Sequence, residues 1–320
     1  MTPLLYGSGA AALGWWRLRS TSLEETASGE VLHQAYRLQA LQSVIHEQKV
    51  EKLFRLLKQA AVEAVVAKGW AAARLYPDSA LRPYGDIDIL VEPTKLAAAE
   101  DVLNSPEAAD CWVDLHKSFS EIDDRTTDHI FSRSVLVSLN GEDIRVLSAE
   151  DHLALLSVHL LKHGAWRPLW LCDVGAIIES LPSTFAWDIC LGKNRTRASW
   201  IKSAVSLAHR LLRADIASVP SGVATRELPA WLEQSVLNQW ATPFAINQPP
   251  MNHSAPMANY LRKPNGFVEA IRQRWPNPIL ATVSVNGEFN DLPRLPYQVG
   301  NCVMRAAQFL VEIPTRLRAT

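Results

Sequence analysis

The sequence lacks the features of a secreted or membrane-bound chain. Its four cysteines, at positions 111, 172, 190 and 302, form no Cys-x-x-Cys pair, which is typical of buried thiols in a reducing cytoplasm. No apolar run approaches the roughly 18 residues that a membrane-spanning helix needs. The apolar N-terminal residues are interrupted by Gly7-Ser8-Gly9, and no basic residue precedes them. We therefore expect a cytoplasmic protein with no signal peptide and no membrane partner.

An excess of charge of either sign is also missing. The 32 Lys and Arg residues face 33 Asp and Glu residues, for a net charge of −1, so we expect no general binding of nucleic acid. The charge is uneven along the chain, because residues 191–320 carry 15 basic and 7 acidic residues, a net of +8, and residues 1–190 carry −9. Two interpretations of this uneven charge stay open: the basic half helps to bind a triphosphate, or the excess charge simply lies on a solvated surface.

Two acids two residues apart are the most informative feature. Asp86 and Asp88 open an apolar run that continues to Val91. Residues i and i+2 of a strand point to the same face, so we expect the two carboxylates side by side, with Ile87 and Ile89 packed in a core. Paired carboxylates repel each other unless one is protonated or a cation balances them. The pattern therefore predicts a site for Mg²⁺ (or Mn²⁺), with Mg²⁺ preferred because it takes carboxylate and phosphate oxygens.

A third acid, Asp114, lies in the alternating stretch from Trp112 to His116, which is typical of a short strand. Three carboxylates on neighbouring strands would form a two-metal site for in-line phosphoryl transfer. The short gap between Asp88 and Asp114 leaves room for one helix, at about residues 94–103.

The order of these residues resembles a bacterial family catalogued as uncharacterised nucleotidyltransferases, within the superfamily that has the polymerase-β-like fold. The resemblance covers about residues 30–215. It implies an α+β protein, with a small mixed β-sheet nucleotidyltransferase core, flanking helices and a mainly helical C-terminal half. The motifs that carry it are Lys68-Gly69, Tyr76-Pro77, Arg82, Asp86-Ile87-Asp88, Val113-Asp114-Leu115-His116, Ser148-Ala149-Glu150-Asp151, His159 to His163 and Leu171-Cys172-Asp173.

The implied reaction moves a nucleoside monophosphate from an NTP to an acceptor. Asp86, Asp88 and Asp114 would hold the metal ions, and Asp114 would also be the general base. The sequence leaves open which NTP is the donor. It also leaves open whether the acceptor is a small molecule, a sugar, a peptide, a protein or an RNA end.

Lys68, Gly69 and Arg82 are candidates for binding the NTP. In the wider superfamily a small residue follows the early glycine, whereas Trp70 follows it here, so we expect a different phosphate contact. Lys68 would supply a positive charge, and the amides at the start of a helix over about residues 70–75 would add to it. Alternatively, Lys68 lies in solvent at a strand end. Arg82 either binds phosphate or pairs with the acid cluster.

Two other functions compete with transfer. His159 and His163 lie four apart on a predicted helix and could bind zinc with Asp173 or His116, as in a metal-dependent phosphohydrolase. No Glu follows His159, so the metalloprotease signature is absent, and a structural or substrate-facing role also explains both histidines. The other alternative is a catalytically inactive nucleotidyltransferase-fold protein that only binds.

Hydrophobic periodicity divides the chain into four predicted parts: a helical lead-in at 1–60, the catalytic core at 61–147, a helical region at 148–215 packed on the core, and a proline-rich region at 216–320 with short elements. Strands are expected at 64–67, 86–91 and 111–115, with a hairpin of 135–139 and 144–147 joined through Asn140-Gly141. Helices are expected at 30–60, 148–163, 169–181, 197–214 and 299–311, the second of them capped by Ser148.

Overall fold

The computed structural model describes residues 2–224, 227–241 and 274–316, without the side chains of residues 309–316. The chain forms two compact units. The first comprises Met1–His159 and Arg167–Arg226, and the second comprises Leu160–Trp166 and Glu227–Thr320. The four-part division stays a prediction, and residues 242–273 of the predicted proline-rich region lie outside the described residues.

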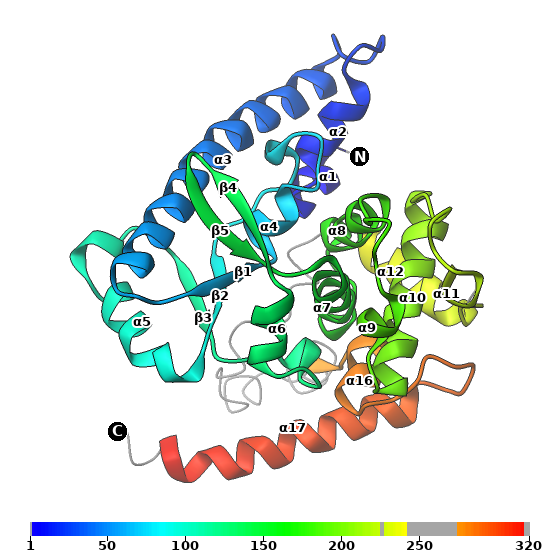
Figure 1. Cartoon of the computed structure of the whole chain (residues 1–320). Coiled ribbons are helices and arrows are strands. Elements are labelled where there is room, and N and C mark those ends of the chain that lie inside the picture. The colour runs from blue at the N-terminus through cyan, green and yellow to red at the C-terminus, as the bar shows by residue number, and fades with distance from the viewer. Residues whose placement is uncertain (1, 225–226, 242–273, 317–320) are drawn as a thin grey trace, which may run out of the picture. The chain divides into compact units, whose positions relative to one another are not determined.

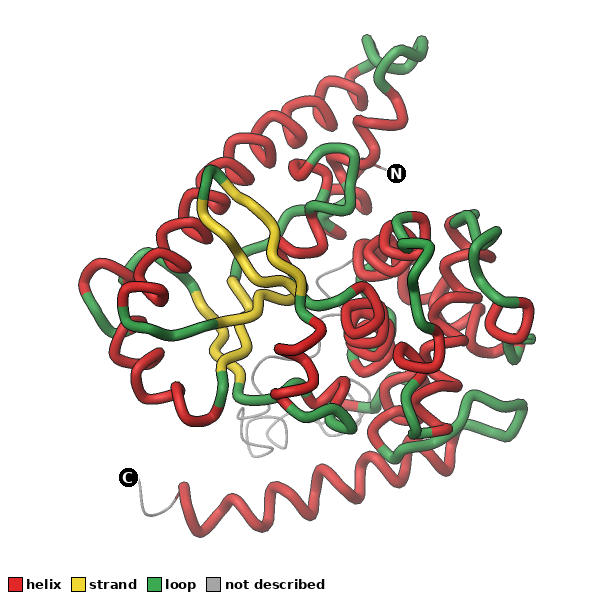
Figure 2. The backbone as a smooth tube through the Cα atoms, viewed as in Figure 1, coloured by secondary structure: helices red, strands yellow, loops and turns green. Residues whose placement is uncertain are grey.

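A five-stranded mixed sheet forms the centre of the first unit (Figure 2). The order of the strands is β3-β2-β1-β5-β4. Strand β1 runs antiparallel to β2 and parallel to β5, β2 runs parallel to β3, and β4 and β5 form the expected hairpin. The expected strands are confirmed, with ends shifted by one or two residues. Their bounds are β1 Ala64–Ala67, β2 Ile87–Val91, β3 Val113–His116, β4 Val135–Leu139 and β5 Glu142–Val146.

Helices account for most of the rest of the described chain, so the predicted α+β fold class is confirmed. All of the expected helices are present, whereas α1, α2, α6, α9, α11, α12 and α16 were not predicted. The helices of the first unit are α1 Thr2–Ser8, α2 Ala11–Leu18, α3 Ala27–Gln59, α4 Gly69–Ala73, α5 Leu96–Leu103, α6 Thr127–Arg133, α8 Pro168–Glu179, α9 Trp187–Leu191, α10 Arg195–Leu212 and α11 Ser221–Ala224. Helix α7, Ala149–Lys162, ends in the second unit, which also holds α12 Ala230–Trp240, α16 Pro278–Ser284 and α17 Leu295–Arg316.

Helix α3 covers one face of the sheet. Its C-terminal half buries Leu53 and Leu57 in a core with Val66 and Ile89, and its N-terminal half packs on α1 and α2 (Figure 1). Because side chains alternate along a strand, the neighbours of Val66 and Ile89 point to the opposite face. Asp88 therefore lies on the sheet face away from α3.

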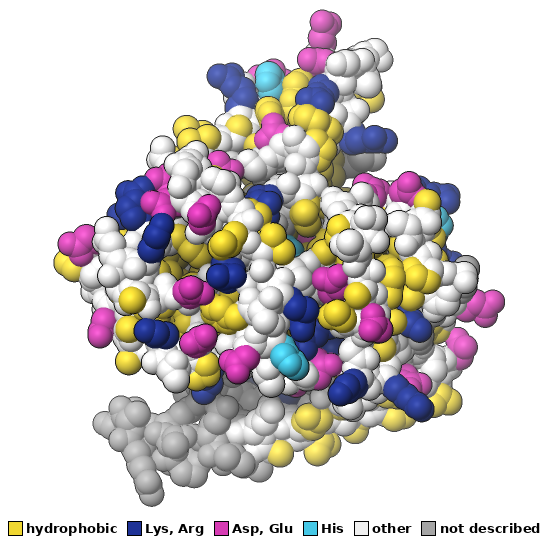
Figure 3. All heavy atoms as spheres, in the orientation of Figure 1, with side chains coloured by type: hydrophobic (Ala, Val, Ile, Leu, Met, Phe, Trp, Pro, Cys, Tyr) yellow, Lys and Arg dark blue, Asp and Glu magenta, His cyan; other side chains and the backbone are white. Residues whose placement is uncertain are grey.

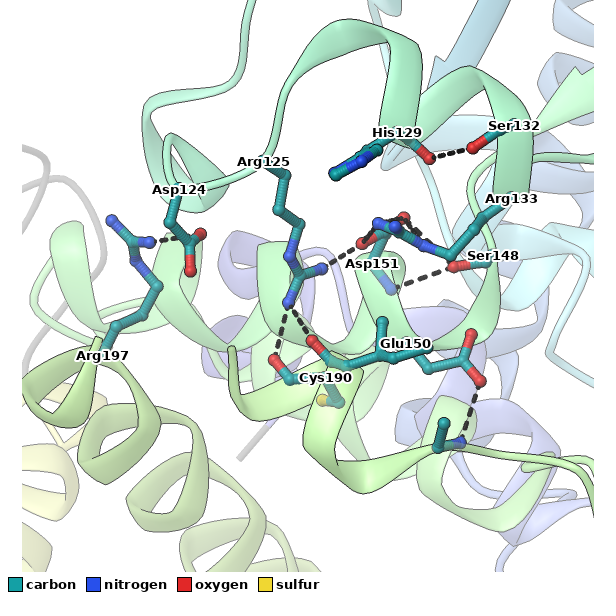
Figure 4. Close-up of polar contacts among 12 residues, drawn as sticks. Asp124, Arg125, His129, Ser132, Arg133, Ser148, Glu150, Asp151, Cys190 and Arg197 are labelled. Carbon is teal, nitrogen blue, oxygen red and sulfur yellow. Dashed lines mark hydrogen bonds and ion pairs between the residues drawn. The ribbon is translucent and has the colours of Figure 1, made fainter. Parts of the chain in front are cut away.

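A buried carboxylate fixes the start of α7 to the chain that follows β3 (Figure 4). Asp151 is fully buried. It accepts hydrogen bonds from Arg125 and, at 2.7 Å, from Nη2 of Arg133. Ser148 Oγ accepts the Asp151 N–H at 3.2 Å, as expected of a helix cap. The predicted capping residues therefore also anchor α7 through buried ion pairs.

The expectation of buried thiols holds for one cysteine of the four. The four cysteines are free, although only Cys190 is fully buried and the other three are half-buried. Acidic and basic side chains are interspersed on the face of the molecule shown in Figure 3. Within the described ranges, no helix combines the length and the apolar character needed to cross a bilayer.

Candidate functional site

Strands β2 and β3 bring two of the predicted acids together. The strands are parallel, and their register pairs Asp88 with Asp114 and Leu90 with His116. Residues paired in this way point to the same face of a sheet, and so does the residue two positions further along each strand. The register therefore places the carboxylates of Asp88 and Asp114 and the imidazole of His116 on one face.

These three side chains form a compact set of possible metal ligands. His116 Nε2 lies 3.1 Å from Asp88 Oδ1 and 3.2 Å from Asp114 Oδ2. One ligand atom of each residue lies within 4.8 Å of the others, and no other such group of three occurs in the part of the chain that the structure describes. Asp88 is buried, whereas the Asp114 side chain is 58% exposed. The cluster thus has a closed side at Asp88 and an open side at Asp114.

The Lys68 side chain contacts the cluster of Asp88, Asp114 and His116 on its buried side, at Asp88. Its Nζ lies 2.7 Å from Asp88 Oδ1, and its side chain is 14% exposed, so the alternative of a lysine in solvent is wrong. Lys68 has a φ of 50° and Gly69 a φ of 22°, and a Cβ on Gly69 would approach the Asp86 carbonyl oxygen to 3.1 Å. This tight turn, at the end of β1, directs the Lys68 side chain toward Asp88 on the neighbouring strand β2.

The charge of Asp88 follows from these contacts. Burial raises the pKa of the Asp88 carboxyl, but the hydrogen bond from His116 and the charge of Lys68 outweigh burial and lower its pKa overall. Asp88 therefore carries a negative charge at neutral pH.

Asp86 does not join this group. It is exposed and lies in a bend one residue before β2, which begins where the Ile87 N–H donates to the Trp112 carbonyl at 2.8 Å. The i, i+2 rule of strands does not extend to a residue outside the strand. A role for Asp86 as a metal ligand stays a prediction.

Arg82 has a different partner from those expected. It is buried, and its Nη2 lies 2.7 Å from Asp173 Oδ2. Tyr76 Oη also donates to Asp173, at 2.8 Å. Burial alone would lower the pKa of Arg82, but the Asp173 charge more than reverses this and raises it. The structure thus pairs Arg82 with an acid outside the cluster, and phosphate binding by Arg82 stays a prediction.

The described residues do not assemble the predicted zinc ligands. His159 Nδ1 lies 3.7 Å from Glu121 Oε1, its ring packs edge-on against Trp170, and the charges of Lys68 and Asp88 act on it. His163 follows the last residue of α7. Neither histidine belongs to the ligand group found within the described ranges. His159 therefore borders the acid cluster rather than forming a second metal site there.

His152, on α7, gives a pH prediction. Burial lowers its pKa from 6.5 to about 4, against the opposing charge of Asp173 and with the help of Arg82 and Arg74. A pKa that is lower in the folded state gives stability that is complete above the unfolded value and is lost as the pH falls toward the folded value. We expect His152→Gln to remove this dependence, so that the free energy of unfolding of the native protein falls by about 3 kcal/mol relative to the variant between pH 7 and pH 4.

The measurement is urea unfolding of both proteins at several pH values, with His129→Gln on α6 as an exposed control. If the free energies of unfolding of the native protein and of His152→Gln differ by the same amount at every pH from 7 to 4, then His152 is not a buried, neutral imidazole.

Comparison with known protein families shows to which family the chain belongs. A family model described as an uncharacterised nucleotidyltransferase matches residues 8–109 and 105–214, which together make up more than half of the 320-residue chain. The chain belongs to this family. No curated protein and no solved structure matches it. The matched segments of the nucleotidyltransferase family include the whole β2–β3 cluster, so the family expected from the sequence is confirmed.

The residues present fit a divalent metal. The cluster of this chain has a buried carboxylate at Asp88, an exposed one at Asp114 and an imidazole nitrogen of His116 within 3.2 Å of both. Carboxylate and imidazole donors are both common ligands of divalent ions. The sequence prediction missed His116 as a neighbour of the acids and considered it only for a zinc site. The sequence nevertheless indicated this contact, because Asp114 and His116 lie two residues apart on one predicted strand and therefore point to the same face.

Proposed function

We propose that this chain is a metal-dependent nucleotidyltransferase with a polymerase-β-like core. It moves a nucleoside monophosphate from an NTP to an acceptor hydroxyl. The observation that carries the proposal is the pairing of Asp88 with Asp114 on adjacent parallel strands, in a chain of a nucleotidyltransferase family. A bound Mg²⁺ or Mn²⁺ would neutralise the triphosphate and lower the pKa of the acceptor hydroxyl.

Asp114 is the proposed general base. Its side chain is 58% exposed, so an acceptor can reach it, whereas Asp88 is enclosed. The acceptor oxygen attacks the α-phosphorus as its proton passes to Asp114. The bond from the α-phosphorus to the bridging oxygen of the β-phosphate breaks, and pyrophosphate leaves with that electron pair.

Lys68 has two proposed positions in this cycle. Without a metal, its ammonium balances Asp88 at 2.7 Å, where a divalent ion would otherwise supply the positive charge. When the ion is bound, Lys68 would be released to the phosphates, next to the Gly69 turn. Asp86 would complete the ligand set from its exposed position before β2. The acceptor stays open among small molecules, sugars, peptides, proteins and RNA ends.

Thermal unfolding with NTP and metal tests whether the two bind together. We expect NTP to raise the melting temperature of the native protein only when Mg²⁺ or Mn²⁺ is present, because the ion joins the acids to the phosphates. Asp88→Asn should abolish this rise while the variant stays folded. Asp110→Asn, which removes an exposed acid paired with Lys52, is the control and should keep it.

Two results would count against the proposal. One is a melting temperature that does not change over a wide range of NTP and metal concentrations. The other is a rise that persists in Asp88→Asn, because the NTP would then bind elsewhere. A variant that cannot fold would show instead that Asp88 is structural, through its contacts with Lys68 and His116.

A further inference from the structure

We propose that His116 is a direct metal ligand and that it makes the site select Mn²⁺ over Mg²⁺. This inference rests on the proposed function. It adds to that function the identity of a third ligand and the chemical preference of the site.

The fold holds the imidazole of His116 in place. Its Cα pairs with that of Leu90 across two parallel strands, and its ring packs on Phe119 with centroids 4.8 Å apart. Phe119 is buried. A ligand whose ring is held before the ion arrives loses little conformational freedom on binding.

The distances in the cluster suit three ligands of one ion. His116 Nε2 lies 3.1 Å from Asp88 Oδ1 and 3.2 Å from Asp114 Oδ2. A single divalent ion could therefore contact all three side chains after a small adjustment of their positions.

The chemistry of the donors favours Mn²⁺ over Mg²⁺. Mg²⁺ is a hard cation that prefers oxygen ligands and water. A neutral imidazole nitrogen adds more affinity for first-row transition ions than for Mg²⁺. The two carboxylates keep the site suitable for an ion that also binds phosphate oxygens, as Mn²⁺ does. Two acids and one imidazole therefore favour Mn²⁺.

A simpler role for His116 is to donate a hydrogen bond to the carboxylates. In that role Nε2 carries a proton and points at Asp88 or Asp114, and it never contacts the ion. The two roles differ in one observable, which is a bond from nitrogen to the metal.

Pulsed electron paramagnetic resonance of Mn²⁺ bound to the full chain detects that bond. We expect the echo of bound Mn²⁺ to carry modulation from a directly bonded nitrogen. The modulation should shift when the native protein is labelled with ¹⁵N-histidine, and it should vanish in His116→Gln. His129→Gln is the control, because His129 is exposed on α6, and it should leave the modulation unchanged.

Competition between the two ions measures the selectivity. Titration of free Mn²⁺ should show that His116→Gln weakens Mn²⁺ binding at least about tenfold and weakens Mg²⁺ binding less, so that the ratio of the two affinities falls. The labelled native protein keeps the test valid if His116→Gln does not fold.

The outcomes separate this inference from the proposed function. Bound Mn²⁺ without nitrogen modulation, or modulation that persists in folded His116→Gln, overturns the role of His116 and leaves the nucleotidyltransferase proposal standing. An unchanged preference for Mn²⁺ in folded His116→Gln overturns the selectivity. A native protein that binds neither ion, with or without NTP, overturns both proposals.

Discussion

Replacing Asp114 by asparagine is expected to slow nucleotidyl transfer at least about a hundredfold while metal-dependent NTP binding persists. General bases contribute about 10²- to 10⁴-fold to turnover. The structure separates the two acids, because Asp88 is buried beside Lys68 and Asp114 is 58% exposed. A group that acts on the acceptor in the transition state lowers kcat more than it weakens binding of the donor.

The measurements for Asp114→Asn are kcat under saturating NTP and the thermal shift with metal and NTP. Asp143→Asn, which removes an exposed acid from β5 of the same sheet, is the control and should match the native protein. Native turnover in Asp114→Asn would remove this residue from the catalytic set. Loss of NTP binding together with turnover would show that the site needs Asp114 chiefly to hold the metal, and its role as general base would then be wrong.

The second large effect is on stability. Asp173→Asn should lower the free energy of unfolding by about 3–5 kcal/mol, the usual cost of leaving one partner of a buried ion pair without its opposite charge. The side chains of Arg82 and Asp173 are 7% and 0% exposed, so solvent cannot replace the lost carboxylate. Tyr76 can still donate to the asparagine oxygen, which confines the change mainly to Arg82.

Urea unfolding checks this prediction. The slope of the free energy of unfolding against urea concentration should be the same in the native protein and in Asp173→Asn. Asp110→Asn is again the matched control, because Asp110 forms an ion pair of similar length, 2.8 Å, with Lys52 at an exposed position, where such pairs add little. An Asp173→Asn protein as stable as the native one would show that Arg82 finds another partner or reaches water.

Local sequence pattern predicted much of the sheet and one pair of site residues. Ala64–Ala67 was expected as a strand and forms one, and Asn140-Gly141 joins the expected hairpin with φ values of 52° and 90°, as its turn chemistry requires. Asp88 and Asp114 were expected to meet because each interrupts an apolar alternation, and the strand register brings them together.

The contacts that pattern could not predict depend on chain geometry or on distant partners. Asp86 was placed with Asp88 by a rule that holds only inside a strand, and β2 begins one residue later. The reach of Lys68 to Asp88 depends on its positive φ, which a lysine rarely adopts. The Arg82 partner, Asp173, lies 91 residues away on α8, and only tertiary packing brings the two side chains together.

Transfer of label from α-³²P NTPs tests the central claim most directly. Each of the four NTPs is incubated in turn with the protein, Mg²⁺ or Mn²⁺ and a cell extract that supplies acceptors. The account predicts that label from one NTP or more moves to an acceptor, that pyrophosphate is released, and that Asp88→Asn abolishes both. Release of orthophosphate without a labelled acceptor would contradict the account and indicate a phosphohydrolase, and no metal-dependent turnover of any NTP would indicate a protein that only binds.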